Sequence, residues 1–190
     1  LQKHLEQLRA GKSIDMPSFD FGRQERFETT RAFALPPDGV AVVEGIHALN
    51  PDVTGSQDPG VFASAGAAFR APDGAVLYPE RLRLLRRLSR DRVFRSRPVE
   101  ETLAMFASVS RGEQRFIFPY RNRAAVCIET GLAYELGLYR TLVLPFLPPD
   151  GPYSALCAEL RYFLQLAVPV QPSDVPRDSL LREFIGDEGL

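Results

Sequence analysis

Two groups of charged residues in this chain could do chemistry. The first is Glu44, a lone acid that follows the apolar residues 40–43 and precedes Gly45. In an open α/β sheet, ligands bind beyond the carboxyl ends of the strands. A carboxylate there can hold Mg²⁺, because this ion prefers one or two carboxylates together with phosphate oxygens. Residues 40–43 are therefore predicted to form a buried strand and Glu44 to be a metal ligand, with a plain strand end as the alternative.

The second group is the arginine-rich segment of residues 81–98. On a helix, Arg83, Arg86, Arg87 and Arg90 fall at i, i+3, i+4 and i+7, which is one face. Like charges at these spacings repel each other, so this face is either solvated or receives an anion. A phosphoryl group in transfer is such an anion, because arginines stabilise the charge on its oxygens. A solvated basic face and a nucleic-acid patch are the alternatives.

Length and charge narrow the class of protein. The chain has 190 residues with a formal net charge of -1, which allows one domain with a sizeable core. Because the arginines are balanced by acids elsewhere, a general nucleic-acid binder is not expected. The longest apolar stretch is interrupted by prolines at positions 145, 148 and 149, so no membrane partner is expected either.

Cysteines and histidines are few. Cys127 and Cys157 lie too far apart for a Cys-x-x-Cys motif, and each sits in an apolar run. They are predicted to be reduced core thiols of a cytoplasmic protein. His4 and His47 are the only histidines, so a histidine zinc site is not expected.

The apolar periodicity predicts the elements that would position these groups. Strands that alternate with helices indicate a parallel α/β architecture, and we expect one domain fragment over residues 1–190. Residues 14–26 are predicted to be irregular or a short strand, and residues 55–74 a surface excursion. Leu84, Leu85 and Leu88 would anchor the basic helix. The predicted helices cover residues 1–9, 81–92, 98–109, 132–143, 152–166 and 177–185, and the predicted strands residues 40–43 and 124–128.

Ordered short motifs along almost the whole chain resemble the uridine kinase and phosphoribulokinase family of P-loop kinases. The later motifs are similar to the bacterial nucleoside kinase branch of that family. The motifs are residues 44–51, 86–91, 94–95, 100–103, 108–113, 116–120, 133–136 and 181–186. The resemblance implies an α/β fold, namely the distal part of a P-loop kinase with a parallel sheet flanked by helices. It also implies an arginine-rich helical lid at about residues 80–98.

The resemblance implies a reaction as well. ATP would donate its γ-phosphoryl group to the 5′-hydroxyl of a uridine- or cytidine-like nucleoside in pyrimidine salvage, with Mg²⁺ held by Glu44. Arg87, Arg90 and Arg97 match the lid arginines that such kinases direct at phosphates and the bound nucleoside. Arginine suits this role because its planar fork meets phosphate oxygens at two points. Asp91 is expected to orient Arg87 or Arg95 rather than to react.

A further match concerns the nucleoside. Phe19, Asp20 and Phe21, followed by Arg26, are similar to an aromatic–acid–aromatic segment of the family that borders the base. Alternate buried residues of an ordinary strand would give the same pattern. Related eukaryotic kinases carry a histidine where this chain has Gln24, and this departure leaves the preference for uridine open.

A phosphate-binding loop is missing from these residues. Gly11, Lys12 and Ser13 imitate the end of the G-x-x-x-x-G-K-[ST] motif, but Glu6 stands where its first glycine is required. No apolar strand precedes them, and residues 1–9 suggest a helix that ends at Gly11. We therefore expect the true loop and the general base to lie upstream of residue 1, and the chain alone to be inactive.

Two alternatives to the nucleoside kinase follow from the same residues. A relative of phosphoribulokinase or pantothenate kinase would phosphorylate another sugar or small hydroxyl substrate. A remnant of the fold without the phosphate loop would act only as a binding module. The expected partners are a small-molecule nucleoside and ATP, and the sequence leaves open whether the chain forms homo-oligomers.

Overall fold

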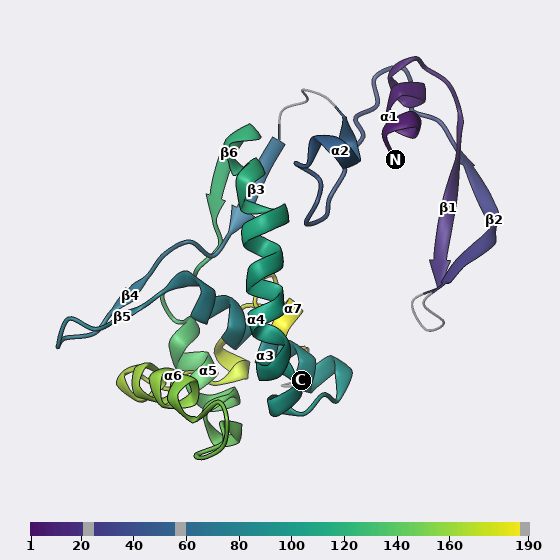
Figure 1. Ribbon diagram of the computed structural model, residues 1–190. Helices are drawn as coiled ribbons and strands as arrows, with labels where there is room; N and C mark the ends of the chain where they lie inside the picture. The colour runs from purple at the N-terminus through teal and green to yellow at the C-terminus, as the bar shows by residue number, and fades with distance from the viewer. Residues whose placement is uncertain (21–24, 56–59, 187–190) are drawn as a thin grey trace. The chain divides into compact units, whose positions relative to one another are not determined.

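The computed structural model describes residues 1–20, 25–55 and 60–186, with only the backbone at residues 28–30. Its internal contacts divide the chain into two compact units. The first unit comprises Leu1–Gly60 and Arg115–Ala125, and the second comprises Val61–Gln114 and Val126–Leu190. Figure 1 traces the elements of both units, which are described one at a time below.

The first unit is built around an antiparallel hairpin. Strand β1 (Ile14–Asp20) pairs with β2 (Glu25–Phe33) so that Ile14 lies opposite Phe33 and Phe19 opposite Arg26. The predicted short strand is thus half of a hairpin whose second strand the sequence did not reveal. The other elements of this unit are the helices α1 (Gln2–Arg9), α2 (Pro51–Thr54) and η1 (Phe118–Arg123).

The Gly-Lys-Ser sequence has the wrong surroundings for a phosphate loop. It follows helix α1 and leads into strand β1, whereas a P-loop connects a strand to a helix. Gly11 has φ 68, a left-handed conformation that suits a residue just beyond a helix end, and its N–H donates to the Leu8 carbonyl. These surroundings differ from those of a phosphate-binding loop, in line with the prediction that this segment only imitates the motif.

The second unit combines short strands with longer helices. Strands β3 (Gly60–Ser64) and β6 (Ala124–Glu129) pair in a parallel two-stranded sheet, and β4 (Phe69–Arg70) and β5 (Val76–Leu77) form a small antiparallel hairpin. The predicted α/β class, with a parallel sheet flanked by helices, is confirmed. The helices of this unit are α3 (Pro79–Arg95), α4 (Val99–Phe116), α5 (Glu135–Leu142), η2 (Leu144–Phe146), α6 (Ser154–Leu166), η3 (Pro172–Asp174) and α7 (Arg182–Ile185).

Helix α3 is held by its leucines. Leu84, Leu85 and Leu88 are 0%, 0% and 2% exposed and belong to the same core cluster as Leu160 and Leu164 of α6. Burying a leucine contributes roughly 1.5–3 kcal/mol, so these contacts fix the helix that carries the arginines. The predicted anchoring of the basic helix is confirmed.

The strand predicted at residues 40–43 is absent. These residues form no helix or strand, and Val40 and Val42 are each 85% exposed. An apolar run becomes a buried strand only where a neighbouring strand takes its backbone hydrogen bonds. Within the described residues, none of the three sheets includes residues 40–43.

Two further predictions need correction. Residues 55–74 were expected to be a surface excursion, but they contain β3, whose Phe62 is buried. Cys127 was expected in the core, yet it lies exposed on β6, while Cys157 is fully buried as predicted. Both cysteines are free thiols.

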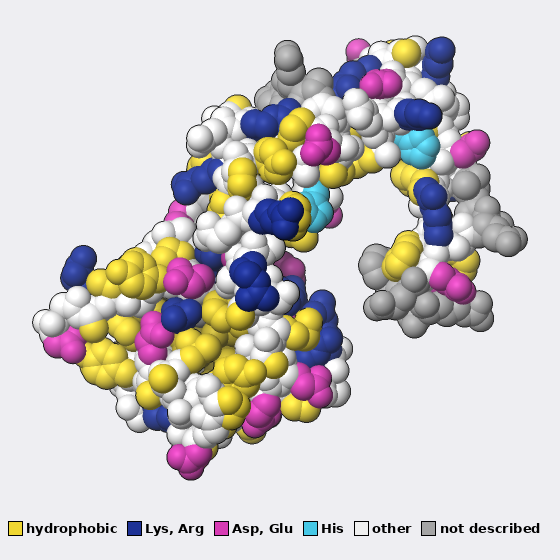
Figure 2. All heavy atoms as spheres, viewed as in Figure 1, with side chains coloured by type: hydrophobic (Ala, Val, Ile, Leu, Met, Phe, Trp, Pro, Cys, Tyr) yellow, Lys and Arg dark blue, Asp and Glu magenta, His cyan; other side chains and the backbone are white. Residues whose placement is uncertain are grey.

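The β3–β6 sheet leaves apolar side chains uncovered. Val61, Val126 and Ile128 are 57%, 53% and 49% exposed, and Figure 2 shows hydrophobic side chains at the surface where this sheet lies. A two-stranded sheet has only edge strands, so neither strand is enclosed on both sides. No helix within the described residues is long and apolar enough to cross a membrane.

Candidate anion-binding site

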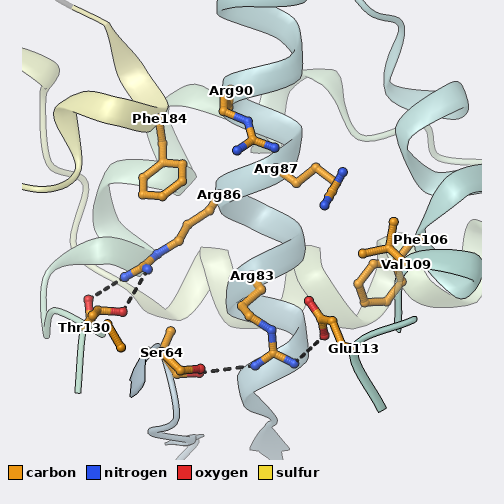
Figure 3. A pocket seen from close by; sticks show the side chains of 12 residues that line it. Ser64, Arg83, Arg86, Arg87, Arg90, Phe106, Val109, Glu113, Thr130 and Phe184 are labelled. Carbon is orange, nitrogen blue, oxygen red and sulfur yellow. Dashed lines mark hydrogen bonds and ion pairs between the residues drawn. The ribbon is translucent and has the colours of Figure 1, made fainter. Parts of the chain in front are cut away.

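A pocket of about 220 Å³ lies beside helix α3 within the second unit. Arg83, Arg86, Arg87 and Arg90 all line it, together with apolar side chains such as Phe106 of α4. Figure 3 shows the arginines along one helix, with Phe106 and Val109 on the side toward which Arg87 points. The predicted grouping of the four arginines on one face is confirmed, but the contacts that each arginine makes with the rest of the protein differ.

Arg83 forms hydrogen bonds with two other segments of the second unit. Its Nη2 donates to Glu113 Oε2 at 2.9 Å, and its Nη1 donates to the Ala65 carbonyl at 3.2 Å. The Arg83 and Glu113 side chains are 22% and 18% exposed, so the pair is partly shielded from water. This arginine connects α3 to α4 and to the chain after β3.

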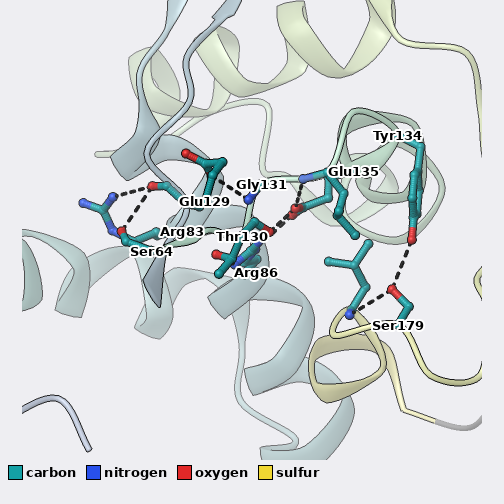
Figure 4. A network of polar contacts seen from close by, with 12 residues as sticks. Ser64, Arg83, Arg86, Glu129, Thr130, Gly131, Tyr134, Glu135 and Ser179 are labelled. Atoms are coloured by element: carbon teal, nitrogen blue, oxygen red, sulfur yellow. Dashed lines mark hydrogen bonds and ion pairs between the residues drawn. The ribbon is translucent and has the colours of Figure 1, made fainter. Parts of the chain in front are cut away.

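Arg86 is also a structural residue. Its Nε and Nη2 donate to the two oxygens of Glu135 at 2.9 and 2.6 Å, and its Nη1 donates to Thr130 Oγ1 at 3.1 Å. Figure 4 shows this network between α3 and the start of α5. Glu135 is 0% exposed. The interpretation of the whole basic face as solvated or anion-binding is therefore wrong for Arg83 and Arg86.

Arg87 and Arg90 are the two arginines of the pocket left for a ligand. Arg87 makes no ion pair or hydrogen bond within the described part of the chain. Arg90 Nε is buried, has no hydrogen-bond partner there, and lies 3.8 Å from Asp91 Oδ1. Burial lowers the pKa of the Arg90 guanidinium, and the charges of Arg95 and Arg87 lower it further. A partly buried cation among like charges gains most from an added anion.

Asp91 organises the other end of helix α3. It is 0% exposed and accepts hydrogen bonds from Arg95 at 2.9 Å, Arg97 at 3.2 Å and the Thr102 hydroxyl at 3.2 Å. The prediction that Asp91 orients Arg87 or Arg95 is confirmed for Arg95, and Arg97 is a second partner. Arg97, predicted to face phosphate, is bonded to Asp91 and does not line the pocket.

Glu44 belongs to the first unit. It is exposed and followed by Gly45 at φ 146, a conformation that favours glycine and opens a turn closed by the Ala48 N–H on the Gly45 carbonyl. In the described residues there is no cluster of three metal-ligating side chains. Glu44 therefore offers one carboxylate, which is the kind of protein ligand that Mg²⁺ bound to a nucleotide accepts.

The predicted nucleoside segment lies at the end of the β1–β2 hairpin. Phe19 is 49% exposed and lies opposite Arg26 in the register, and Asp20 lies opposite Glu25. The structure thus brings Phe19 and Arg26 together on one ladder. Phe21 is outside the described residues.

The sequence interpretation missed an acid at the end of β6. Both oxygens of Glu129 accept the Gly66 N–H at 3.0 Å, and Oε1 also accepts the Gly131 N–H at 2.6 Å. Burial raises the pKa of this carboxyl, but these backbone donors outweigh it, so the pKa is lowered. The available signal was an apolar strand that ends in an acid, the same pattern that drew attention to Glu44.

Several known proteins of similar sequence are uridine kinases. No protein-family model matches the chain. A uridine kinase of Staphylococcus epidermidis is 32% identical over 130 residues, which are 67% of this chain and 56% of the relative. Uridine kinases of Macrococcus caseolyticus and Halobacterium salinarum are 31% and 32% identical over 133 residues, which are 69% of this chain and 57% and 52% of those relatives.

The chain thus spans about half the length of the curated relatives that it matches. The matched share of the chain and the common name of these relatives agree with the motifs and with the α/β fold of the structure. The chain belongs to the uridine kinase family.

Proposed function

We propose that this protein is a nucleoside kinase that transfers the γ-phosphoryl group of ATP to the 5′-hydroxyl of a pyrimidine nucleoside, as a cytoplasmic enzyme of pyrimidine salvage. The observation that carries the proposal is the state of Arg87 and Arg90. They share one pocket, and neither makes a hydrogen bond from its guanidinium within the described residues. The names of the relatives support the choice of a uridine-like acceptor.

Arg87 and Arg90 would act on the charge of the phosphoryl group. In phosphoryl transfer there is little covalent chemistry for the protein to do, so catalysis consists mainly of positioning and electrostatic stabilisation. Phe106 and Val109 give the same pocket an apolar wall. Charges that are shielded from water by such a wall interact more strongly, and water is kept from the phosphoryl group.

Glu44 would supply the protein ligand of Mg²⁺. A single exposed carboxylate fits this role, because the ion takes its remaining ligands from phosphate oxygens and water. When bound, the ion neutralises charge on the phosphates. We assign no general base, because no carboxylate of the described residues is suited to the role.

The β1–β2 hairpin would border the nucleoside. Phe19 and Arg26 face each other in the register, with Asp20 next to them, and Phe21 completes the motif in the sequence. An exposed aromatic ring offers a base a stacking surface worth about 1–3 kcal/mol. Asp20 and Arg26 offer an acceptor and donors to polar groups of the base or the sugar.

A substrate panel tests the proposal. Release of ADP from ATP would be followed with the protein as its gene encodes it, in the presence of uridine, cytidine, adenosine, ribulose 5-phosphate or pantothenate. We expect release that depends on uridine or cytidine and on Mg²⁺, with a nucleoside 5′-monophosphate as the product in ³¹P NMR. Release that depends only on a non-nucleoside acceptor would identify a different kinase of this family. No release with any acceptor would leave a binding module and refute the proposal.

A further inference from the structure

Asp91 is a buried carboxylate surrounded by three arginines. Its Oδ1 accepts a hydrogen bond from Arg95 Nη1 at 2.9 Å, and its Oδ2 accepts one from Arg97 Nη1 at 3.2 Å. The Thr102 hydroxyl donates to Oδ2 at 3.2 Å. Arg90, the preceding residue, comes no closer than 3.8 Å from its Nε to Oδ1. A carboxylate that is 0% exposed requires such partners, because an unpaired buried charge is costly.

The local backbone explains why Asp91 pairs with the later arginines. Arg95 is one helical turn beyond Asp91, at the i+4 spacing that brings side chains together. Ser96 then ends α3 in a left-handed conformation, with φ 48 and ψ 33. This turn leads the chain back, so that the Arg97 N–H donates to the Asp91 carbonyl at 3.1 Å. The Arg97 side chain thereby reaches the carboxylate of the same residue.

The contacts of Asp91 with Arg95 and Arg97 determine how closely Arg90 is paired. Each oxygen of Asp91 already has a closer cationic partner than the Arg90 Nε. That Nε is buried and makes no hydrogen bond within the described residues, while the Arg90 side chain lines the pocket. We infer that Arg95 and Arg97 are positioning residues, which occupy both oxygens of Asp91 and so leave Arg90 available for a phosphate.

This inference rests on the proposed function, since it takes the ligand of Arg90 to be a phosphate group. It differs from the expectation for Arg97, because Arg97 acts through Asp91 and not by touching the ligand. If Arg97 is removed, Oδ2 keeps only the Thr102 hydroxyl. Arg90 is then the nearest remaining cation beside Arg95, and pairing with Asp91 would take its charge away from the pocket.

Binding of inorganic tripolyphosphate, measured by calorimetry on the full chain at low salt, tests the inference without any turnover. Arg97→Ala should weaken binding roughly tenfold, the loss expected for one charged hydrogen bond. Asp91→Asn alone should bind as tightly as the unchanged protein or more tightly. The double variant Arg97→Ala/Asp91→Asn should recover to within about threefold of Asp91→Asn, because the competing carboxylate is gone.

A matched control separates competition from net charge. Glu101 lies 3.9 Å from Arg97 Nε, and its side chain is 65% exposed. Glu101→Gln removes the same charge as Asp91→Asn but leaves the carboxylate beside Arg90. We expect no recovery of binding when it is combined with Arg97→Ala. Equal recovery by both second substitutions would overturn the inference, since overall charge would then explain it.

Arg95→Ala provides a second route, because the Arg95 side chain is 47% exposed and its loss should not prevent folding. It should weaken tripolyphosphate binding as well, and Asp91→Asn should restore it. A double variant that binds as weakly as its arginine single variant would show that the arginine itself contacts the phosphate. Failure of the unchanged protein to bind tripolyphosphate would also overturn the inference. Rescue by Asp91→Asn in a protein that phosphorylates no nucleoside would refute the proposed function alone.

Discussion

Arg86 and Glu135 form a two-point ion pair inside the second unit, with Arg86 Nε 2.9 Å from Oε2 and Nη2 2.6 Å from Oε1. Glu135 also accepts the Leu132 N–H at 2.8 Å, from the segment that precedes α5. Burial alone would lower the pKa of Arg86, but the hydrogen bonds and charge of Glu135 outweigh it, so the pKa is raised. The pair links helix α3 to α5 and keeps one arginine of the basic face out of ligand binding.

Loss of one partner should destabilise the second unit strongly. We expect Glu135→Ala to lower the free energy of unfolding by about 3–5 kcal/mol, because Arg86 would be left buried without its counter-charge. Urea unfolding followed by circular dichroism measures this. Glu159→Ala is the matched control, since Glu159 pairs with Arg81 on the same helix at 2.9 Å but is 31% exposed; its cost should stay below about 1 kcal/mol. Equal costs for the two variants would contradict the structural role of Arg86.

The carboxylate of Glu129 should make stability depend on pH. Its pKa is lowered in the folded protein, so its contribution is fully present above the ordinary glutamate value of about 4.3. That contribution is lost as the pH falls through the folded-state pKa. We expect Glu129→Gln to be less stable than the unchanged protein at pH 7, with a difference that shrinks below about pH 4. A difference in urea midpoint that stays constant from pH 7 to pH 3 would exclude this role.

The two thiols should react very differently. Cys127 is exposed on β6, whereas Cys157 is buried in α6 and burial raises its pKa. A thiol reagent should therefore modify Cys127 in the native protein. Its reaction with Cys157 requires unfolding and should be at least roughly a hundredfold slower than its reaction with Cys127. Mass spectrometry of the modified peptides identifies each site. Comparable rates at both thiols would contradict the burial of Cys157.

Most helices could be predicted because their signals are local, although the helix predicted at residues 177–185 is limited to Arg182–Ile185 and the helix predicted at residues 98–109 extends to Phe116. The leucine spacing on α3 and the proline and acids at the start of α4 lie within a few residues of the structure they determine. Strands could not be predicted as well. Residues 40–43 have the composition of a buried strand, but a strand also depends on a neighbour that the local sequence does not specify.

The roles of the site residues also depend on contacts that the local sequence does not specify. Arg83, Arg86, Arg87 and Arg90 are one residue type on one helix face, and the sequence treats them alike. The carboxylates that engage Arg83 and Arg86 are 30 and 49 residues away along the chain. Only the fold shows that two of these arginines are structural. Within the described residues, Arg87 and Arg90 also line the pocket, but Arg87 has no carboxylate partner and the one carboxylate near Arg90 is Asp91, 3.8 Å from its Nε.

Substitution of Glu44 tests the proposed metal ligand. Glu44→Gln should raise the Mg²⁺ concentration needed for half-maximal activity roughly tenfold, because an amide is a weaker ligand for this hard cation than a carboxylate. The measurement is a Mg²⁺ titration of uridine-dependent ADP release. Asp52→Asn removes another exposed carboxylate of the first unit and should leave the titration unchanged. An unaltered Mg²⁺ dependence in Glu44→Gln would remove Glu44 from the site.

The most direct test of the central claim is the turnover of Arg90→Ala. We predict that kcat for nucleoside phosphorylation falls roughly a hundredfold while KM for the nucleoside changes little, because Arg90 would act on charge that develops during transfer. Arg92→Ala, on the same helix but outside the pocket lining, should stay within about threefold of the unchanged enzyme. A kcat of Arg90→Ala equal to that of Arg92→Ala would contradict the claim that the pocket beside α3 receives the phosphoryl group.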